Sequence, residues 1–431
     1  MPKQLPTRER LAQQWGMAAA WVIQSKDIPL QRKGMYPCVK AIPAPRVLTI
    51  LVKLQNSSDL SKLCGMQEDL ALDMGIKNCR ITRSYGNVVI EIPFPADLCT
   101  ILPAKSLKRK DGLWLTLGKT SQMQPIQVKL DGPEIAPIIV TGRTGAGKTE
   151  ALKLMLWELA LQNIPQDLGI VVFDPKNKFQ AVSHLPHLRC PILRTDEDGM
   201  RAVCWLAEEL DRRMRHEYST PKIVVFVDEL INLLQMDNSG IISEKIGSIA
   251  RLGREMGIHL IIATQRPSRK YLDAVVAANI GLRLVGHTPD TTEATTAAGR
   301  GGSNAHKLTG RGDVVAILGA SMKRIQIAMV DDTDLENLPR AEAPTPLLGY
   351  NLDVEEDSPR RIPFTPRELA VALTDAGIIK LREQLHIGQP RATELRHDWA
   401  EPILEELGRS GYRVILEESK EERDDAEGGT A

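Results

Sequence analysis

The clearest chemical pattern in the sequence is a short glycine-rich segment. It consists of Gly142, Arg143, Thr144, Gly145, Ala146, Gly147, Lys148 and Thr149, which fits G-x-x-x-x-G-K-[ST]. Apolar residues Ile138–Val140 precede it, and a helical pattern at Glu150–Gln162 follows it. In such a loop the backbone N–H groups and the helix N-terminus surround phosphate, whereas a glycine-rich turn that binds nothing does not need the complete pattern. We therefore expect ATP here, with Lys148 on the β- and γ-phosphates and Thr149 on Mg²⁺.

Two acidic residues follow the apolar run Ile223–Val227. Asp228 and Glu229 would be costly inside a buried strand, so we expect them at the carboxyl edge of a sheet, where phosphate chemistry takes place. Asp228 is expected to complete the Mg²⁺ shell, and Glu229 to act as general base toward the attacking water. The alternative is a solvated strand end before a helix, because helix N-termini favour acids. A pair of acids favours an ATPase that turns over repeatedly.

Two further strand ends carry polar residues. Gln265 follows the apolar run at 259–264, and its amide is placed either to sense the γ-phosphate or simply to cap the strand. Phe173-Asp174-Pro175-Lys176 ends another strand with an acid and a cation. This segment is either a turn in which Pro175 ends the strand, or a site at which Lys176 acts directly. Gln265 is therefore a candidate catalytic residue, and the role of Lys176 stays open.

A second glycine-rich segment, 299–313, carries Arg300, Lys307 and Arg311. Glycine lets a backbone approach a phosphate chain closely, so these cations are candidate contacts to a phosphate backbone. A flexible surface hairpin that leads to the strand Val314–Leu318 is the alternative.

Short apolar runs alternate with longer helical segments from about residue 112, which predicts an α/β core with a parallel sheet and crossover helices. The expected strands are Ile138–Val140, Ile170–Phe173, Ile223–Val227, His259–Ala263, Leu282–Val285 and Val314–Leu318. Upstream, a helix over residues 7–25, a strand at Val47–Lys53 and a hairpin around Gly86-Asn87 predict a small α+β module.

These patterns divide the chain into several predicted parts. They are an N-terminal helical segment at 1–40, a small α+β domain at 41–110, an ATPase domain at 111–338, a Pro-rich acidic linker at 339–362, a second small helical domain at 363–416, and a disordered acidic tail at 417–431.

The composition excludes several classes of protein. The 431 residues include 55 Lys and Arg against 55 Asp and Glu, so the chain is not a strongly basic nucleic-acid binder, and any DNA contact must come from locally placed cations. The six cysteines are scattered without a C-x-x-C pair, which favours reduced thiols in the cytoplasm over a zinc or disulfide framework. The apolar stretch Trp15–Ile23 is too short to span a bilayer, so we expect no membrane insertion by the chain itself.

Taken together, the motifs resemble those of the FtsK/SpoIIIE family of double-stranded DNA translocases. The resemblance is carried in the family's order and spacing by the glycine-rich loop, Phe173–Lys176, His184–Leu188, Trp205–Arg213, Val227–Leu230, Gly257–Ser268, Ala278–Ile280 and Gly310–Asp313. It implies a RecA-like P-loop motor that binds ATP and Mg²⁺, acts on duplex DNA and assembles as a homohexameric ring. Leu385–Ala392 is similar to part of the family's winged-helix domain, which implies that residues 363–416 are winged-helix-like and that Arg391 contacts DNA.

We therefore expect a cytoplasmic, ring-forming ATPase that moves duplex DNA, for example in transfer of a plasmid or an integrative element. Two alternatives stay open at this point. One is a DNA-binding regulator whose affinity is switched by ATP, and the other is a related ATPase that drives protein secretion.

Overall fold

The computed structural model of the chain describes residues 7–84, 86–133, 135–230, 233–234, 240–265 and 279–340, together with Ala392 and Arg396. The chain divides into two units between Asn351 and Leu352, and the helices and strands below all belong to the first. The acidic tail, Arg391, almost all of the linker and, apart from Ala392 and Arg396, the predicted winged-helix-like domain at 363–416 lie outside the described residues. No helix within the described ranges is long and apolar enough to cross a membrane.

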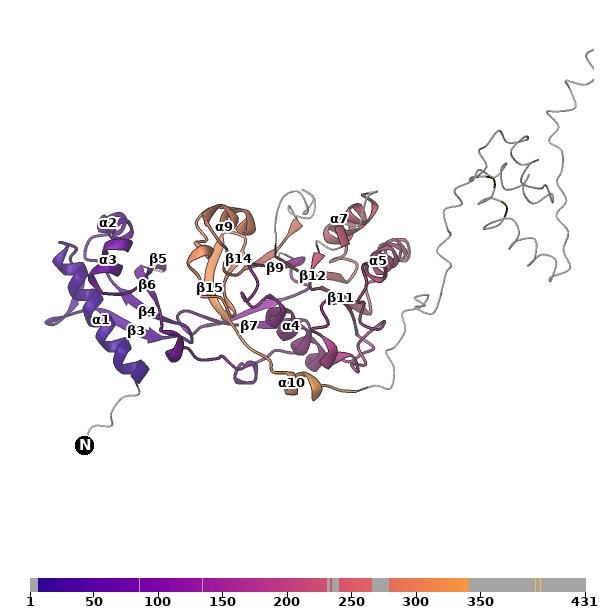
Figure 1. The fold of residues 1–431 in the computed structure, drawn as a ribbon, viewed down its shortest axis with the longest axis horizontal. Helices are drawn as coiled ribbons and strands as arrows, with labels where there is room; N and C mark the ends of the chain where they lie inside the picture. Colours follow the sequence, from indigo (N-terminus) through magenta and orange to yellow (C-terminus); the bar gives the residue numbers. More distant parts are fainter. Residues whose placement is uncertain are drawn as a thin grey trace, which may run out of the picture. The chain divides into compact units, whose positions relative to one another are not determined.

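The first part of the chain forms a small α+β domain around a four-stranded antiparallel sheet with the order β3-β4-β6-β5 (Figure 1). Its elements are α1 (Thr7–Ser25), β1 (Arg32–Lys33), β2 (Tyr36–Pro37), β3 (Val39–Pro43), β4 (Val47–Val52), α2 (Asp59–Gly65), α3 (Gln67–Asp73), β5 (Arg80–Ser84) and β6 (Asn87–Pro93). The helix, the strand and the hairpin expected from the sequence are all present.

Helix α1 packs onto the sheet of this domain rather than standing alone. Its buried side chains recur on one side of the helix and join the same apolar core as β4 and β6. A Cβ atom at Gly16 would lie 3.3 Å from the Ala41 Cβ on β3, so this glycine permits a close approach of helix and strand.

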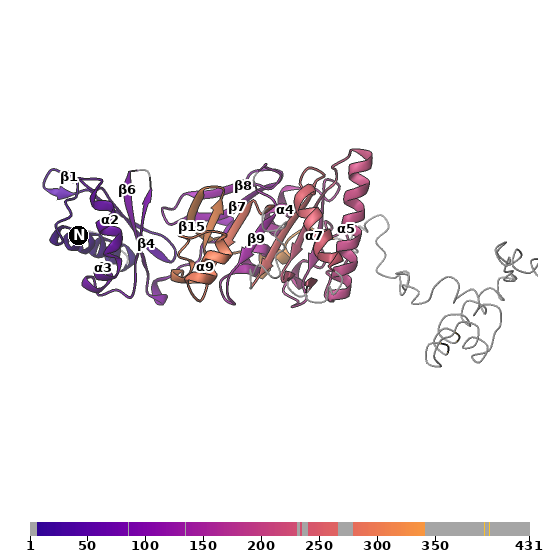
Figure 2. The same cartoon turned by 90° about the horizontal axis from the view of Figure 1, so that it is seen from above.

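A nine-stranded sheet dominates the rest of the unit, with the order β10-β11-β12-β9-β13-β14-β15-β7-β8 (Figure 2). The strands are β7 (Trp114–Thr120), β8 (Pro125–Lys129), β9 (Ile138–Thr141), β10 (Leu168–Phe173), β11 (Lys222–Val227), β12 (Ile258–Thr264), β13 (Leu282–Val285), β14 (Asp313–Leu318) and β15 (Ser321–Ile327). The principal helices are α4 (Lys148–Gln162), α5 (Asp196–His216), α7 (Ile241–Leu252), α9 (Thr291–Ala298) and α10 (Asp332–Glu336). The predicted α/β class with a P-loop between strand and helix is confirmed.

The sheet is mixed, however, and the expectation of a parallel sheet holds only for the neighbouring strands β10, β11, β12, β9 and β13. Strands β13, β14, β15, β7 and β8 pair antiparallel along the other half. Residues 319 and 320 alone connect β14 to β15, which is too short for the crossover that parallel strands require. The sequence analysis also missed β7, β8 and β15.

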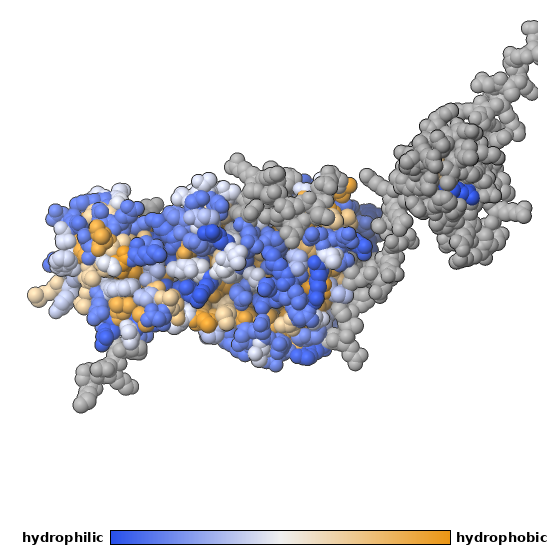
Figure 3. Space-filling view, viewed as in Figure 1, coloured by the Kyte–Doolittle hydropathy of each residue, from blue (hydrophilic) through white to orange (hydrophobic). Residues whose placement is uncertain are grey.

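The two domains meet through a network of buried charges. Arg324 on β15 donates from Nε and Nη2 to both oxygens of Asp313, at 2.8 and 2.7 Å, and its Nη1 lies 3.2 Å from Glu91 Oε2 on β6. Glu91 also pairs with Arg80 at 3.1 Å. Burial alone would raise the pKa of Glu91, but Arg324 and Arg80 hold it below its usual value. Figure 3 shows mainly hydrophilic residues on the viewed face of the molecule.

Candidate functional site

The glycine-rich loop predicted from the sequence connects β9 to α4. Gly142, Gly145 and Gly147 have φ values of 140°, 81° and 99°, which other residues adopt only with strain. A Cβ atom at Gly147 would lie 2.5 Å from the Gly312 nitrogen, so only glycine fits beneath the start of β14. The Lys148 ammonium folds back over the loop and donates to the carbonyls of Gly142 and Arg143, at 2.8 and 3.2 Å. Burial lowers the pKa of Lys148, and the nearby carboxylates of Glu229 and Asp228 oppose that fall.

Strand β11 brings Asp228 to the first turn of α4. Thr149 Oγ1 donates to Asp228 Oδ1 at 3.0 Å, and the Asp228 side chain is almost fully buried. Burial raises the pKa of Asp228, while the Thr149 hydrogen bond and Lys176 oppose that rise. A hydroxyl and a carboxylate side by side at the P-loop are hard oxygen ligands, which fits the few protein ligands that Mg²⁺ takes beside a nucleotide.

Glu229 is held by two side chains that come from neighbouring strands. Gln265, just after β12, donates from Nε2 to Glu229 Oε2 at 3.1 Å, and its Oε1 accepts from the Thr144 hydroxyl at 3.0 Å. Lys176, just after β10, places its Nζ 3.2 Å from the same Glu229 oxygen. A continuous chain of contacts thus joins the P-loop residue Thr144 to Glu229. The structure brings together the four strand ends that the sequence analysis singled out.

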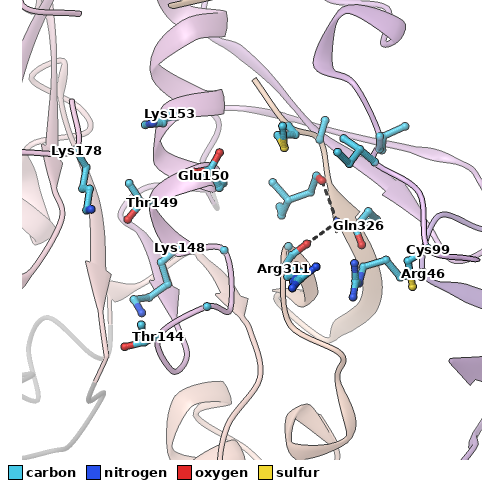
Figure 4. Close-up of a pocket in the computed structure, with 18 of the residues that line it drawn as sticks. Arg46, Cys99, Thr144, Lys148, Thr149, Glu150, Lys153, Lys178, Arg311 and Gln326 are labelled. Atoms are coloured by element: carbon cyan, nitrogen blue, oxygen red, sulfur yellow. Dashed lines mark hydrogen bonds between the residues drawn. The ribbon is translucent and has the colours of Figure 1, made fainter. Parts of the chain in front are cut away.

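A cavity of about 890 Å³, a volume typical of sites for small organic ligands, begins here. Thr144, Lys148, Thr149, Lys176, Asp228 and Gln265 line this end of it, and Glu229 lies behind Lys176 and Gln265, which both contact it. Figure 4 shows Thr144, Lys148 and Thr149 on one side of Arg311, with Arg46 and Cys99 on the other. Lys153 and Lys178 also line the cavity. The concentration of cations and P-loop N–H groups favours a ligand with several negative charges.

The predicted DNA contacts do not form one cluster. Arg311 lines the cavity, and its backbone N–H donates to the Gly145 carbonyl at 2.9 Å. Arg300 instead donates from Nη2 to the Ala320 carbonyl at 2.8 Å, beyond the opposite end of β14. Lys307 ends a short 3-10 helix at Ala305–Lys307. Arg311 therefore lies beside the P-loop, and Arg300 lies a strand's length away.

Sequence reasoning missed several residues of this cavity. Lys178 follows the Asp174-Pro175-Lys176 turn that the analysis had marked, so its position two residues further on was a usable indication. Arg46 comes from the turn between β3 and β4 in the N-terminal domain. No motif surrounds Arg46, and only the packing of the two domains brings it to the cavity.

Comparison with known proteins agrees with the motifs. The FtsK/SpoIIIE family model matches residues 100–217 and 214–269. A Bacillus anthracis protein named DNA translocase FtsK is 27% identical over 384 residues, covering 78% of this chain and 47% of that protein. The Bacillus subtilis protein named DNA translocase SpoIIIE is 27% identical over 381 residues, covering 78% of this chain and 48% of that protein. The chain spans about half the length of the curated relatives it matches.

Among solved structures, the monomer form of the pCW3 conjugation coupling protein TcpA with ATPγS aligns at a TM-score of 0.48 and 19% identity, covering 74% of this chain and 96% of that one. That score is too low to carry an argument about function. The motif order, the family-model match across the P-loop and the acid pair, and the two alignments over most of the chain carry the assignment. Residues 100–269 thus match the FtsK/SpoIIIE family model, and the chain is similar to DNA translocases of that name over most of its length.

Proposed function

We propose that this chain hydrolyses ATP and couples hydrolysis to movement along double-stranded DNA. The observation that carries the proposal is the position of Glu229, which is nearly buried and fixed by Gln265 and Lys176 beside the P-loop. A protein that only binds ATP as a switch does not need a second acid held in this place. The names of the relatives, both DNA translocases, support DNA as the substrate.

The chemistry assigned to each residue follows from its contacts. The P-loop N–H groups and Lys148 bind the β- and γ-phosphates, and Thr149 and Asp228 would hold Mg²⁺, which supplies charge neutralisation at the phosphates when bound. Glu229 accepts the proton of the attacking water as general base. Gln265 joins Thr144 to Glu229 by hydrogen bonds, so a γ-phosphate that contacts the loop would also change the position of the Glu229 carboxylate.

The finer parts of the proposal concern assembly and DNA contact. We propose a homohexameric ring that acts in the cytoplasm, with Arg300, Lys307 and Arg391 on the DNA backbone. Because Arg311 lies beside the P-loop, its effect should be separated from theirs. Arg311→Ala should change nucleotide affinity, whereas Arg300→Ala with Lys307→Ala should reduce the salt dependence of DNA binding, since each lost phosphate contact lowers the slope by about one.

The deciding experiment measures ATP hydrolysis with and without linear duplex DNA, at low and high salt, and in parallel the displacement of a triplex-forming strand from the duplex. Lys148→Ala is the inactive control. The proposal is supported if duplex DNA stimulates hydrolysis, if this stimulation falls steeply as the salt concentration rises, and if strand displacement accompanies it. Hydrolysis that ignores DNA at low salt would contradict it and favour a secretion ATPase. Tight ATP-dependent DNA binding without turnover would favour the regulator.

A further inference from the structure

The cavity that begins at the P-loop continues into a region with a different chemical character. Its far end is lined by Ile101 and Leu102, from the segment that leaves the N-terminal domain, and by Ile327, Ala328 and Met329, which end β15 and follow it. Arg46 and Gln326 are polar groups at this end. We call Arg46, Ile101, Leu102, Gln326, Ala328 and Met329 the distal wall. It is mainly apolar, whereas the P-loop end is polar and cationic.

Backbone hydrogen bonds join the two apolar segments of the distal wall. Met329 donates its N–H to the Leu102 carbonyl at 2.8 Å, and Ala104 donates to the Met329 carbonyl at 2.9 Å. Even so, the Ile101 side chain is 62% exposed and Met329 is 38% exposed. Large apolar side chains held rigidly at a cavity wall and left uncovered are suited to bury the flat face of a ligand.

Arg46 is fixed in place at this wall. Its Nε donates to Thr309 Oγ1 at 3.0 Å, and Thr309 in turn donates to Asp313 Oδ2 at 2.8 Å. The Arg46 carbonyl accepts from the Phe94 N–H at 2.9 Å. The Nη1 and Nη2 groups make no hydrogen bond to any residue within the described ranges, and Figure 4 shows the guanidinium near Gln326 and Cys99, across Arg311 from Lys148.

A nucleotide has the same division as this cavity, with a polyanionic triphosphate at one end and a flat aromatic base at the other. We propose that the distal wall binds the base and ribose, with the Arg46 guanidinium against the base, so that the N-terminal domain takes part in nucleotide recognition within the same chain. This inference rests on the proposed binding of ATP at the P-loop. Guanidinium groups stack on aromatic rings, and the apolar wall supplies the opposite face.

The first test compares a ligand that has a base with one that lacks it. Equilibrium binding of ADP and ATP and of inorganic tripolyphosphate, all with Mg²⁺, is measured for the full chain. Arg46→Ala should weaken nucleotide binding roughly three- to tenfold and leave tripolyphosphate binding within about twofold, because only the base contact is lost. Arg46→Lys should restore little, since an ammonium lacks the planar stacking face. Arg32→Ala, on the exposed β1–β2 hairpin, is the matched control and should change neither ligand.

The second test uses a natural probe and does not depend on a variant. Cys99 lines the distal part of the cavity and is half-buried, whereas Cys64 is exposed elsewhere. ADP should slow alkylation of Cys99, tripolyphosphate should not, and Cys64 should react equally in both cases, as read by mass spectrometry of the labelled peptides.

The outcomes separate this inference from the proposed function. If Lys148→Ala binds ATP like the wild-type chain, ATP binding at the P-loop is wrong, and the inference falls with it. Suppose that Lys148→Ala loses the binding of both ATP and tripolyphosphate, while Arg46→Ala weakens the binding of both ligands equally or of neither. The distal wall then does not bind the nucleotide base. Protection of Cys99 by tripolyphosphate as strong as that by ADP would overturn it as well.

Discussion

The two ends of the cavity are built in opposite ways. The phosphate end uses eight consecutive residues, 142–149, and three residues that each follow a strand of one sheet: Asp228, Glu229 and Gln265. The distal wall collects Arg46, Ile101, Leu102, Gln326, Ala328 and Met329 from three segments, and the last of these lies more than two hundred residues after the other two. Backbone N–H groups can surround a phosphate only from a local glycine-rich loop, whereas a base is bound by shape, which any packed surfaces can supply.

The difference extends to what holds each end in place. The phosphate end is fixed within the parallel half of the large sheet. The distal wall depends on the interface between domains, where Arg324 joins Asp313 to Glu91. We expect changes at the phosphate end to act on chemistry at constant fold, and changes behind the distal wall to act on stability and base binding together.

The largest effect is expected at Glu229. Glu229→Gln keeps the size of the side chain and leaves Gln265 and Lys176 in place, but it removes the general base. We therefore expect kcat to fall by about 10²–10⁴-fold while ATP stays bound. Steady-state hydrolysis and equilibrium ATP binding are measured side by side. Glu150→Gln, in the first turn of α4 and lining the same cavity, is the control and should retain most of the turnover. Turnover of Glu229→Gln at the wild-type rate would remove the central residue of the mechanism.

The next effect is expected at the interface behind the distal wall. Arg324→Met leaves two buried carboxylates, Asp313 and Glu91, without their shared cation, which should cost about 3–5 kcal/mol of unfolding free energy. Urea unfolding measures this loss. Arg80→Met removes only one of the two cations beside Glu91 and should cost less.

The same variant bears on the comparison of the two ends. Where Arg324→Met stays folded, it should weaken the binding of ATP more than the binding of tripolyphosphate. The reason is that Asp313 accepts a hydrogen bond from Thr309, which in turn accepts one from Arg46. Equal loss of both ligands would mean that the two ends of the cavity share one support.

The sequence was sufficient to place the P-loop and the parallel strands and insufficient for the antiparallel half of the large sheet and for the distal wall, for physical reasons. The P-loop and the buried strands β9–β13 are local patterns of glycine and of apolar residues, so their positions were predicted to within one or two residues. Strand β15 reads Ser-Met-Lys-Arg-Ile-Gln-Ile, and its polar residues concealed a strand, because Arg324 is buried only by pairing with distant acids. Arg46 is equally invisible, since its role comes from tertiary packing alone.

A smaller effect is expected where α4 meets the antiparallel half of the sheet. Glu158, nearly fully buried on α4, accepts a hydrogen bond from the Thr116 N–H of β7, and burial raises its pKa from 4.5 to about 7. The folded chain therefore holds this proton to a higher pH than the unfolded chain does. The contribution of Glu158 is fully present below about pH 4.5 and is lost as the pH rises toward 7.

Glu158→Gln should remove that part of the pH dependence, on the order of 1–3 kcal/mol between pH 5 and pH 8, because a neutral amide keeps the acceptor oxygen without the charge. Urea unfolding across this pH range measures it, and the exposed Glu68→Gln is the control. A pH profile of Glu158→Gln that matches the wild-type profile would show that another group titrates.

The smallest effect separates two lysines at the phosphate end. Lys176 and Lys178 both line the cavity, but only Lys176 contacts Glu229, at 3.2 Å, among the contacts of the described residues. The Lys176 side chain is 41% exposed, and exposed ion pairs contribute up to about 1 kcal/mol, so Lys176→Met should lower kcat by about two- to fivefold. Lys178→Met removes the same charge from the cavity without touching Glu229 and should alter ATP affinity by a similar factor while leaving kcat nearly unchanged. Equal kcat values for the two variants would mean that Lys176 supplies only charge to the cavity, and that Gln265 alone positions the general base Glu229.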